Sequence, residues 1–323
     1  MLKGGEAVLE IVKLDPRGRL GAAGASVTAL GFFDGVHLGH RQLFLAAVAE
    51  AARRGEGTVP AVFTFSDDVR RVKVGAARLT DFETKLSLIE AAGIRRVYVA
   101  DFPSVAGLSP EEFVSEILVR RCGTVFAVCG FNFRFGHRAA GDAALLSELM
   151  RASGGDAAVI PPLYLGDMVI SSSAIRAAIE AGDMPRAAAM LGRPFSLTAP
   201  VLHGRGFGHT AGVPTVNQVF AESGILPKSG VYACRVRFAD GASALAVANV
   251  GVCPTFGGDG DVHCETHLID YAGDLYGERV TVEFLRYLRP ERRFESPEAL
   301  YAQVRNDIED ARKAVSDSSL RSE

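Results

Sequence analysis

The order of strand-like and helical runs along the chain is the feature that most limits its fold. Up to about residue 190, apolar runs typical of β-strands alternate with runs that have helical spacing. The expected strands are 27–30, 59–65, 97–100, 125–129 and 157–160, and the expected helices are 41–54, 82–92, 110–121 and 142–153. One more helix is expected from Ser173 to near Gly182. Strands that alternate with helices favour a parallel sheet covered by helices.

The sequence pattern changes after Pro194, where short β-type runs are separated by turns rich in glycine and proline. The runs are 197–203, 230–238, 243–250, 262–270 and 279–285. This pattern predicts an antiparallel barrel or sandwich. An amphipathic helix is expected at about 297–315, because Leu300, Val304 and Ile308 recur at helical spacing. The stretch 183–194 is interpreted as a connecting segment, and the expected domains are 1–186 and 187–323.

The composition is that of an ordinary globular protein, and a length of 323 residues favours two domains. The net charge of −3 and the scattered basic pairs form no basic face, so we expect no nucleic-acid partner. No apolar run reaches about 18 residues, so no membrane span is expected. The N-terminus lacks a secretory pattern, which predicts a cytoplasmic protein. The sequence leaves open whether the chain forms a homo-oligomer.

The five cysteines are odd in number and form no Cys-x-x-Cys pair, which favours buried thiols in a reducing compartment. Cys253, His263, Cys264 and His267 lie close enough in sequence to raise the question of a metal site. The two histidines, however, fall in a strand-like segment, and the spacing matches no zinc module. We therefore expect no structural metal at these residues.

The segment 31–40 reads GFFDGVHLGH and places the imidazoles of His37 and His40 three residues apart, between an expected strand and an expected helix. A strand that turns through glycines into a helix directs backbone N–H groups and the positive end of the helix dipole at one point, which suits phosphate. Two histidines there can donate hydrogen bonds to phosphate oxygens and stabilise charge during transfer. The pattern predicts nucleotidyl transfer, against the plainer interpretation of a histidine pair that caps a turn.

Two further segments of this half support a phosphate-transfer site. The segment 171–176, SSSAIR, puts hydroxyls at a helix N-terminus with Arg176 one turn in. Capping explains the serines in part, but an arginine beside open N–H groups also suits a triphosphate. The segment 130–141, GFNFRFGHRAAG, alternates phenylalanines with polar residues. It fits either a half-buried strand extension or an apolar pocket for an aromatic ring, with Asn132 and Arg134 facing the polar end of the ligand.

Segments 31–40, 130–141 and 171–176 resemble the three signatures of the FAD synthetase module in bacterial bifunctional riboflavin kinase/FAD synthetases. The β-rich half resembles the riboflavin kinase module, block by block and in the same order. Its blocks are 204–217, 230–232, 248–256, 265–270, 274–277 and 284–289. The resemblance runs from about residue 26 to about residue 312. It implies a Rossmann-like nucleotidyltransferase domain, followed by an antiparallel β-barrel riboflavin kinase domain with a C-terminal helix.

For the second half, the resemblance implies ATP-dependent phosphorylation of riboflavin to FMN. Glu265 would be the catalytic carboxylate that takes the proton of the 5′-hydroxyl as this attacks the γ-phosphate of ATP, although composition alone favours a plain surface carboxylate. Thr215 and Asn217 would offer oxygen ligands to Mg²⁺, although an ordinary turn after a proline is the other interpretation. The residues expected at ATP also include Gly204 and Gly208, and those expected at the flavin are Tyr276 and Arg289.

For the first half, the resemblance implies that the phosphate of FMN attacks the α-phosphate of ATP, so that FAD forms and pyrophosphate leaves. His37 and His40 would stabilise charge on the transferring phosphate, and Asn132 would help to hold the substrates. Mg²⁺ is expected in both sites. The residues expected to bind ATP or its phosphates are Gly31, Phe33, Asp34, Gly39, Ser172, Ser173 and Arg176, and those expected at the flavin are Phe65, Phe131 and Arg134.

Several positions depart from the family pattern. Phe32 stands where asparagine is usual, and the segment 66–69, SDDV, stands where a Pro-His-Pro turn is usual. Acidic groups near phosphates are unfavourable unless they bind metal or point away, so both departures bear on the efficiency of FAD synthesis. In the kinase half, His209 replaces a usual arginine and Val213 a usual phenylalanine, and both bear on nucleotide affinity.

Three alternatives remain open. The first is a riboflavin kinase whose adenylyltransferase half is impaired, which the segment 66–69 supports. The second is a non-catalytic flavin-binding regulator or carrier, which the presence of Thr215, Asn217 and Glu265 disfavours. The third is another His-x-Gly-His transferase, of the pantetheine or glycerol-phosphate type, which the whole second domain disfavours.

Overall fold

The computed structural model describes residues 8–15, 24–66, 77–202, 215–220, 224–252, 262–271 and 273–319. These residues form two compact units. The first contains the described residues up to Ile170, except Ala77–Leu79. The second contains Ala77–Leu79 and the described residues from Ser171 onward, so the helix expected at 173–182 belongs to it.

The core of the first unit is a sheet of six parallel strands. In sheet order they are β1 (Glu10–Leu14), β4 (Arg96–Ala100), β3 (Val59–Phe65), β2 (Ser26–Leu30), β5 (Thr124–Gly130) and β8 (Asp156–Ile160). Five of the six were predicted from apolar runs. The edge strand β1 was not, because its sequence EIVKL mixes charged and apolar side chains and is largely exposed.

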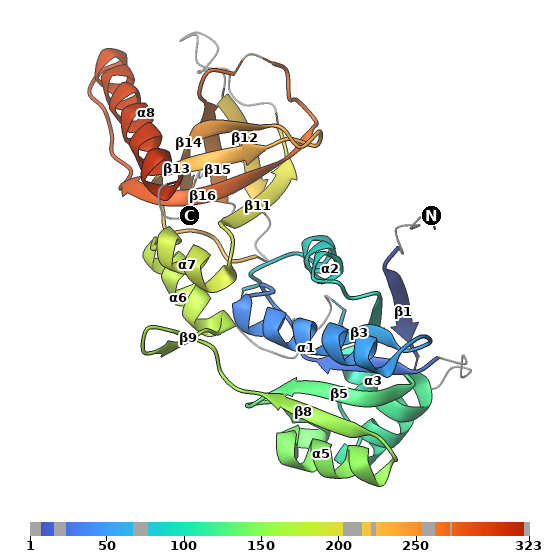
Figure 1. Ribbon diagram of the computed structural model, residues 1–323. Helices are drawn as coiled ribbons and strands as arrows, with labels where there is room; N and C mark the ends of the chain where they lie inside the picture. Colours follow the sequence, from blue (N-terminus) through green and yellow to red (C-terminus); the bar gives the residue numbers. More distant parts are fainter. Residues whose placement is uncertain are drawn as a thin grey trace. The chain divides into compact units, whose positions relative to one another are not determined.

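Helices cover both faces of this sheet (Figure 1). The long ones are α1 (Leu38–Arg54), α2 (Phe82–Ala91), the π-helix η2 (Phe113–Arg121) and α5 (Ala143–Ala152). Successive residues of a strand face opposite sides, so Val62 of β3 packs with the cluster of α1 and α2, whereas Phe63 packs with that of η2 and α5. The predicted doubly covered parallel sheet is confirmed.

Shorter elements connect these helices and strands. They are α3 (Phe102–Val105), α4 (Pro110–Glu112), β6 (Arg134–Phe135), η3 (His137–Ala139), β7 (Gly141–Asp142), β9 (Tyr164–Leu165) and β10 (Met168–Val169). Helix α4 runs directly into η2, so the helix expected at 110–121 is present, but it is more loosely wound after its first turn.

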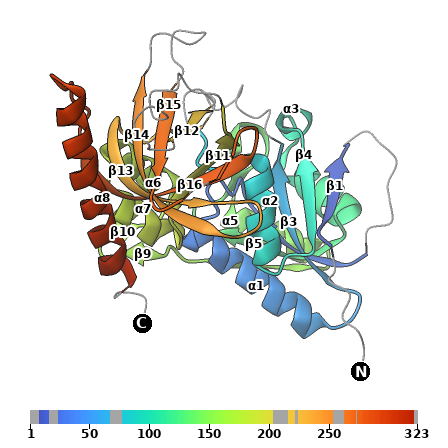
Figure 2. The same ribbon diagram turned by 90° about the horizontal axis from the view of Figure 1, so that it is seen from above.

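The second unit is built on an antiparallel sheet of six strands that curls into a nearly closed barrel (Figures 1 and 2). In sheet order they are β11 (Phe195–Pro200), β16 (Arg279–Arg289), β13 (Gly230–Arg237), β14 (Ser243–Val252), β15 (Val262–Leu268) and β12 (Thr215–Phe220). Two contacts link the end strands: the Leu202 N–H donates to the Asn217 carbonyl at 2.8 Å, and Gln218 Nε2 donates to the Ala199 carbonyl at 2.7 Å. The predicted barrel with a C-terminal helix is confirmed.

Helix α8 (Pro297–Ser319) lies along the outside of the barrel (Figure 2). Its Ala311 and Ala314 pack in one cluster with Val231 of β13 and Val247 of β14. The helix therefore covers outward-facing residues such as Val231 and Val247, whereas alternate residues, such as Tyr232 and Ala248, are fully buried on the other face.

The interpretation of 183–194 as a connecting segment is wrong, because it contains helix α7 (Met184–Leu191), which follows α6 (Ser172–Ala181). The Asp183 carboxylate caps the helix by accepting from the Arg186 N–H at 3.1 Å, and Gly192 ends it in a left-handed conformation. Eight alanine-rich residues carry too little periodicity for sequence recognition. The helix forms because Met184, Ala187, Met190 and Leu191 are buried.

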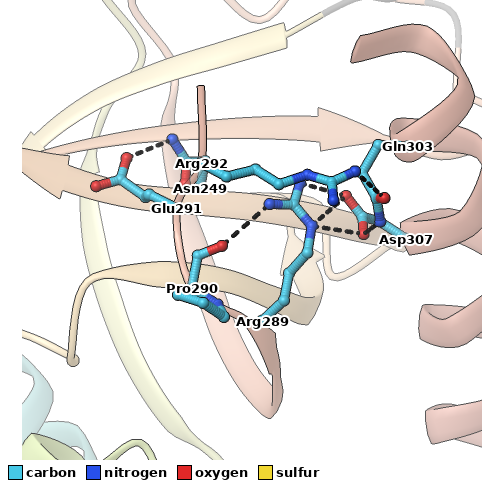
Figure 3. A network of polar contacts seen from close by, with 7 residues as sticks. All are labelled: Asn249, Arg289, Pro290, Glu291, Arg292, Gln303 and Asp307. Carbon is cyan, nitrogen blue, oxygen red and sulfur yellow. Dashed lines mark hydrogen bonds and ion pairs between the residues drawn. The ribbon is translucent and has the colours of Figure 1, made fainter. Parts of the chain in front are cut away.

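A polar network fastens α8 to the end of β16 (Figure 3). Arg289 donates from Nη2 to Asp307 Oδ2 at 2.7 Å and from Nε to Oδ1 at 2.9 Å. Asp307 is only 2% exposed and also accepts from Gln303 Nε2 at 2.7 Å. A buried carboxylate needs such a partner, because an unpaired charge away from water is costly.

We expect Arg289→Met to destabilise the second unit by about 3 kcal/mol, because it leaves the Asp307 carboxylate buried without its cation. Hydrogen exchange of the backbone amides of β16 and α8, followed by mass spectrometry, measures this change within the unit. Arg293→Met is the matched control, because Arg293 is exposed on the neighbouring segment. Equal protection in the two variants would contradict the assignment.

Candidate functional site

The first candidate site lies at the carboxyl edge of the parallel sheet, where the strand order reverses. Strand β2 pairs with β3 on one side and with β5 on the other. In open parallel sheets, ligands bind outside the carboxyl ends of the strands at such a reversal. The predicted segment 31–40 follows β2 and the predicted segment 130–141 follows β5. Two motifs about 100 residues apart therefore leave adjacent strands at the same edge of the sheet.

The loop from β2 to α1 is held in an unusual backbone conformation. Phe33 has a φ of 56° and Val36 a φ of 40°, which are rare for residues with side chains. Gly31 makes room for this turn, because a Cβ there would lie 2.9 Å from the Phe33 ring. Phe33 and Asp34 are both buried. The predicted phosphate loop is thus a rigid turn whose shape is set by packing.

His37 and His40 are brought together as predicted. His37 is the N-cap of α1, and its Nδ1 accepts from the His40 N–H at 3.3 Å. The two rings stack with centroids 3.5 Å apart. Because Nδ1 of His37 accepts, the proton of the neutral ring sits on Nε2, where it can donate to a ligand. Gly39 allows this arrangement, because a Cβ there would lie 3.1 Å from the His37 ring.

Burial holds the pKa of His40 well below its usual range, and the charges of His37 and Lys85 lower it further. His40 is therefore neutral at physiological pH. Its Nδ1 is buried, and no hydrogen-bond partner is found for it among the described residues. A buried ring nitrogen of this kind is poised for a ligand or a water molecule, because leaving it unpaired is unfavourable.

Lys85 lies at the candidate site and was not predicted from the sequence. It lies on α2 and is only 5% exposed. Its Nζ donates to the carbonyl of Phe65, the last residue of β3, at 3.3 Å. The ammonium also lies 5.4 Å from the centre of the Phe32 ring and 4.9 Å from that of Phe82, which are favourable cation–π distances. The structure therefore places a cation at the carboxyl edge of the sheet, beside the family departure at Phe32.

The segment 130–141 leaves β5 as a turn and a short hairpin of β6 and β7, so the interpretation as a strand extension does not hold. Phe131 is 48% exposed, whereas Phe135 is buried and stacks on Phe133 with centroids 5.6 Å apart. Asn132 folds back over Gly130, with its Oδ1 3.5 Å from the position of a Cβ there. The exposed Phe131 ring and the Asn132 amide thus stand at the end of β5.

The segment 171–176 belongs to the second unit. Ser171 caps α6 by accepting from the Ala174 N–H at 3.2 Å, which confirms the capping part of the interpretation. Arg176 donates from Nε to the carbonyl of Ala77 at 2.7 Å. The binding of nucleotide phosphates by Ser172, Ser173 and Arg176 remains a prediction.

The second candidate site is a row of polar residues on the outer face of the barrel. Asn217 of β12 lies opposite Glu265 of β15, and Glu265 lies opposite Asn249 of β14. Directly opposed residues of antiparallel strands point to the same face, with Cβ atoms about 5 Å apart. Glu265 is exposed. The row thus brings a carboxylate between two amides, and Asn249 was not among the predicted site residues.

The other predicted residues have varied surroundings. Tyr276 is 41% exposed, Arg289 is bound to Asp307 in the network of Figure 3, and Arg134 forms a loose ion pair with Asp142 at 4.0 Å. Several predicted or divergent residues lie outside the described residues, namely Asp67, Asp68, Val69, Gly204, Gly208, His209 and Val213, and the side chain of Thr215 is not described.

The prediction of buried thiols is confirmed for the four cysteines that the structure describes. Cys122, Cys129, Cys234 and Cys264 are buried and free, and burial raises the pKa of the Cys264 thiol to about 12. Cys264 faces the barrel interior, whereas His263 and His267 occupy alternate positions on the outer face. Within the described ranges, no group of three or more metal-ligating side chains is present.

Comparison with known proteins identifies both halves. The family described as FAD synthetase matches residues 21–174, and the family described as riboflavin kinase matches residues 191–315. A bifunctional riboflavin kinase/FMN adenylyltransferase from Pseudomonas fluorescens is 34% identical and covers 91% of this chain and 94% of its own. One from Bacillus subtilis is 33% identical over 88% of this chain and 91% of its own.

A solved structure is also similar over nearly the whole chain. It is described as a macrolide-efflux protein from Streptococcus pneumoniae, with a TM-score of 0.83 and 28% identity, and the match covers 94% of this chain and 99% of that one. In the present protein, no helix within the described residues is long and apolar enough to cross a membrane.

The lowered pKa of His40 makes stability depend on pH. The folded state keeps His40 neutral, whereas the unfolded chain takes up a proton below about pH 6.5. The unfolded state therefore binds more protons at low pH, and the free energy of unfolding of the first unit falls as pH drops from 7 to 5. We expect this fall to be shallower in His40→Gln, as measured by urea unfolding at several pH values. His137→Gln, at an exposed histidine, should keep the wild-type slope, and equal slopes in all three proteins would contradict the prediction.

Proposed function

The chain belongs to the family of bifunctional riboflavin kinases/FMN adenylyltransferases, and from this premise we propose that each of its two sites carries one of the two reactions. The protein phosphorylates riboflavin to FMN with ATP and transfers an adenylyl group from ATP to FMN, which gives FAD. The assignment of one reaction to each site rests on one observation. The FAD synthetase match contains the His37–His40 pair, and the riboflavin kinase match contains the row around Glu265. We place the functional boundary near residue 186, between the two matches.

In the kinase reaction, Glu265 accepts the proton of the riboflavin 5′-hydroxyl while the hydroxyl oxygen attacks the γ-phosphorus of ATP. The P–O bond to ADP breaks, and FMN and ADP are the products. The exposure of Glu265 on the barrel face supports this role, because a hydroxyl substrate can reach its carboxylate. The amides of Asn217 and Asn249 on either side present further polar groups at the same place.

The residues of this row suit a magnesium ion. Mg²⁺ prefers hard oxygen ligands, and it usually binds through one or two protein groups together with substrate phosphates. Asn217 offers an amide oxygen on the face that carries the Glu265 carboxylate, and Thr215, two residues earlier on β12, is the second proposed ligand. When bound, the ion would neutralise charge on the phosphates of ATP. Gly204 and Gly208 are proposed to approach the nucleotide, and Tyr276 and Arg289 the flavin.

In the adenylyl-transfer reaction, a phosphate oxygen of FMN attacks the α-phosphorus of ATP, and the bond to pyrophosphate breaks. Nε2 of His37 and a ring N–H of His40 are proposed to donate to the oxygens of the transferring phosphate. The backbone of the turn from β2 to α1, with Gly31, Phe33, Asp34 and Gly39, is proposed to cradle the nucleotide at the positive end of α1. Ser172, Ser173 and Arg176 are proposed to bind its other phosphates.

The flavin of FMN is proposed to lie at the carboxyl ends of β3 and β5. Phe65 ends β3 and Phe131 follows β5. The exposed Phe131 ring offers a face for stacking, and Asn132 and Arg134 supply polar groups beside it.

We also propose that the protein acts in the cytoplasm, because its four described cysteines are free thiols, as is usual in a reducing compartment.

The two activities should separate by mutation. Purified protein with riboflavin, ATP and Mg²⁺ is expected to form FMN and then FAD in a chromatographic assay. Glu265→Gln should reduce FMN formation roughly a hundredfold, because it removes the base, and should still convert supplied FMN to FAD. His40→Asn should do the reverse. Accumulation of FMN without FAD in the wild type would instead indicate an impaired adenylyltransferase, and a loss of both activities in each variant would argue against separate sites.

Lys85→Met should also affect only the first site. The lysine places a positive charge beside His40, where two phosphorylated substrates meet, so its loss should lower the rate of FAD formation from FMN by at least about tenfold. The kinase activity of the same preparation reports on correct folding. Lys13→Met, on the edge strand β1, is the matched control. An unchanged rate of FAD formation in Lys85→Met would show that this charge serves the fold alone.

A further inference from the structure

Asn249 has its amide held in one orientation. Its Nδ2 donates to Oε1 of Glu291 at 3.0 Å (Figure 3). A carboxylate can only accept, so the nitrogen must face Glu291 and the oxygen must face away from it. This assignment follows from chemistry, whereas the two ends of most amides are hard to tell apart.

Glu291 is itself held in place from both sides. Its carboxylate lies over Gly251, where a Cβ would collide with it, so the glycine provides the space that it occupies. The backbone on which Glu291 sits follows Arg289 and Pro290, and Arg289 is fastened to the buried Asp307 of α8. Arg292 on the other side of Glu291 donates to Gln303 of the same helix. Figure 3 shows the bond from Asn249 to Glu291 beside the contacts of Arg289 and Arg292 with α8, and the backbone of residues 289–292 joins the two groups.

The oxygen of Asn249 has no such partner. Oδ1 is buried, and no hydrogen bond reaches it from the residues that the structure describes. Leaving a buried acceptor unpaired is unfavourable, so the fixed orientation of this amide lowers the stability of the free protein. The neighbouring residue in the row is Glu265, directly opposite Asn249 on β15. The unpaired acceptor therefore stands beside the carboxylate to which the kinase reaction is assigned.

We propose that Asn249 is a substrate-binding residue of the kinase site, whose amide oxygen accepts a hydrogen bond from a hydroxyl of the polyol chain of riboflavin, and that Glu291 is the positioning residue that orients it. The proposal rests on the assignment of riboflavin phosphorylation to Glu265. A polyol supplies several O–H donors in a row. Glu265 takes the proton of the terminal hydroxyl. The amide oxygen of Asn249, which lies directly opposite Glu265 on the neighbouring strand, can then accept a hydrogen bond from another hydroxyl of the same polyol chain.

Removing either partner of the hydrogen bond between Asn249 and Glu291 gives the first test. Asn249→Ala and Glu291→Ala should each raise the KM for riboflavin about tenfold with kcat nearly unchanged, because the bond is equally present in the ground state and in the transition state. Glu291→Gln should stay close to the wild type, since its amide oxygen still accepts from Asn249 Nδ2. The double variant Asn249→Ala/Glu291→Ala should be no worse than Asn249→Ala, because the two residues act through one bond.

Steric displacement of Glu291 gives an independent version of the same test. Gly251→Ala adds a Cβ where the Glu291 carboxylate lies, and a flexible side chain can move away without disturbing the strand. Its KM for riboflavin should therefore rise as in Glu291→Ala. Glu295→Ala is the matched control, because this carboxylate is exposed four residues along the same segment. Conversion of supplied FMN to FAD by the same preparations should be unchanged in every variant.

Riboflavin analogues that each lack one hydroxyl of the polyol chain identify the bond itself. One of them should raise KM in the wild type by the same factor as Asn249→Ala does with riboflavin, and Asn249→Ala should no longer distinguish that analogue from riboflavin. A fall in kcat with unchanged KM for riboflavin would overturn the proposal in favour of a structural role. A change confined to the dependence on Mg²⁺ or ATP would overturn it in favour of a metal or nucleotide contact. Failure of the wild type to form FMN would instead refute the kinase assignment on which it rests.

Discussion

The proposed adenylyl-transfer site depends on the parallel pairing of β2 with both β3 and β5. Buried hydroxyls hold β2 against β5, because Thr28 Oγ1 lies 2.9 Å from Thr124 Oγ1 and Ser26 Oγ donates to the Cys122 carbonyl at 2.8 Å. This register aligns the carboxyl ends of the two strands. The His37–His40 turn and Phe131 therefore follow adjacent strands at the same edge of the sheet, although about 90 residues of chain separate them.

The turn itself shows how packing and function share the same residues. Phe33 adopts a positive φ and is fully buried, so the backbone strain is supported by the core beneath it. That strained turn positions His37 at the N-terminus of α1, where its ring stacks on His40. Burial then keeps His40 neutral. The lowered pKa of His40 lets this imidazole donate a hydrogen bond without adding another full charge beside Lys85.

The outer face of the barrel places the Glu265 carboxylate between the amides of Asn217 and Asn249. Strand register alone produces the row of Asn217, Glu265 and Asn249. The helix α8 then braces the end of β16 through Arg289 and Asp307, so that the following segment can reach back to Asn249. The same arginine that the sequence suggested for the flavin is thus also part of the frame that orders the site.

The sequence by itself determined the fold class and the two-part organisation, and it predicted that His37 and His40 lie together after a strand. Strand and helix periods, glycines at turns and the His-x-Gly-His spacing are local signals, and local signals are readable without a structure. Helix α7 escaped notice because so short a helix owes its form to burial against the rest of the chain. Strand β1 escaped notice because its mixed, largely exposed sequence carries no strand period. Lys85 and Glu291 escaped notice because nothing in their neighbouring residues marks them, and Asn249 was not singled out within the segment 248–256 because its sequence does not show that it lies opposite Glu265. Only the tertiary structure brings a lysine of α2 beside His40, or a glutamate after β16 onto an asparagine of β14, because proximity between distant segments is decided by sheet order and strand register.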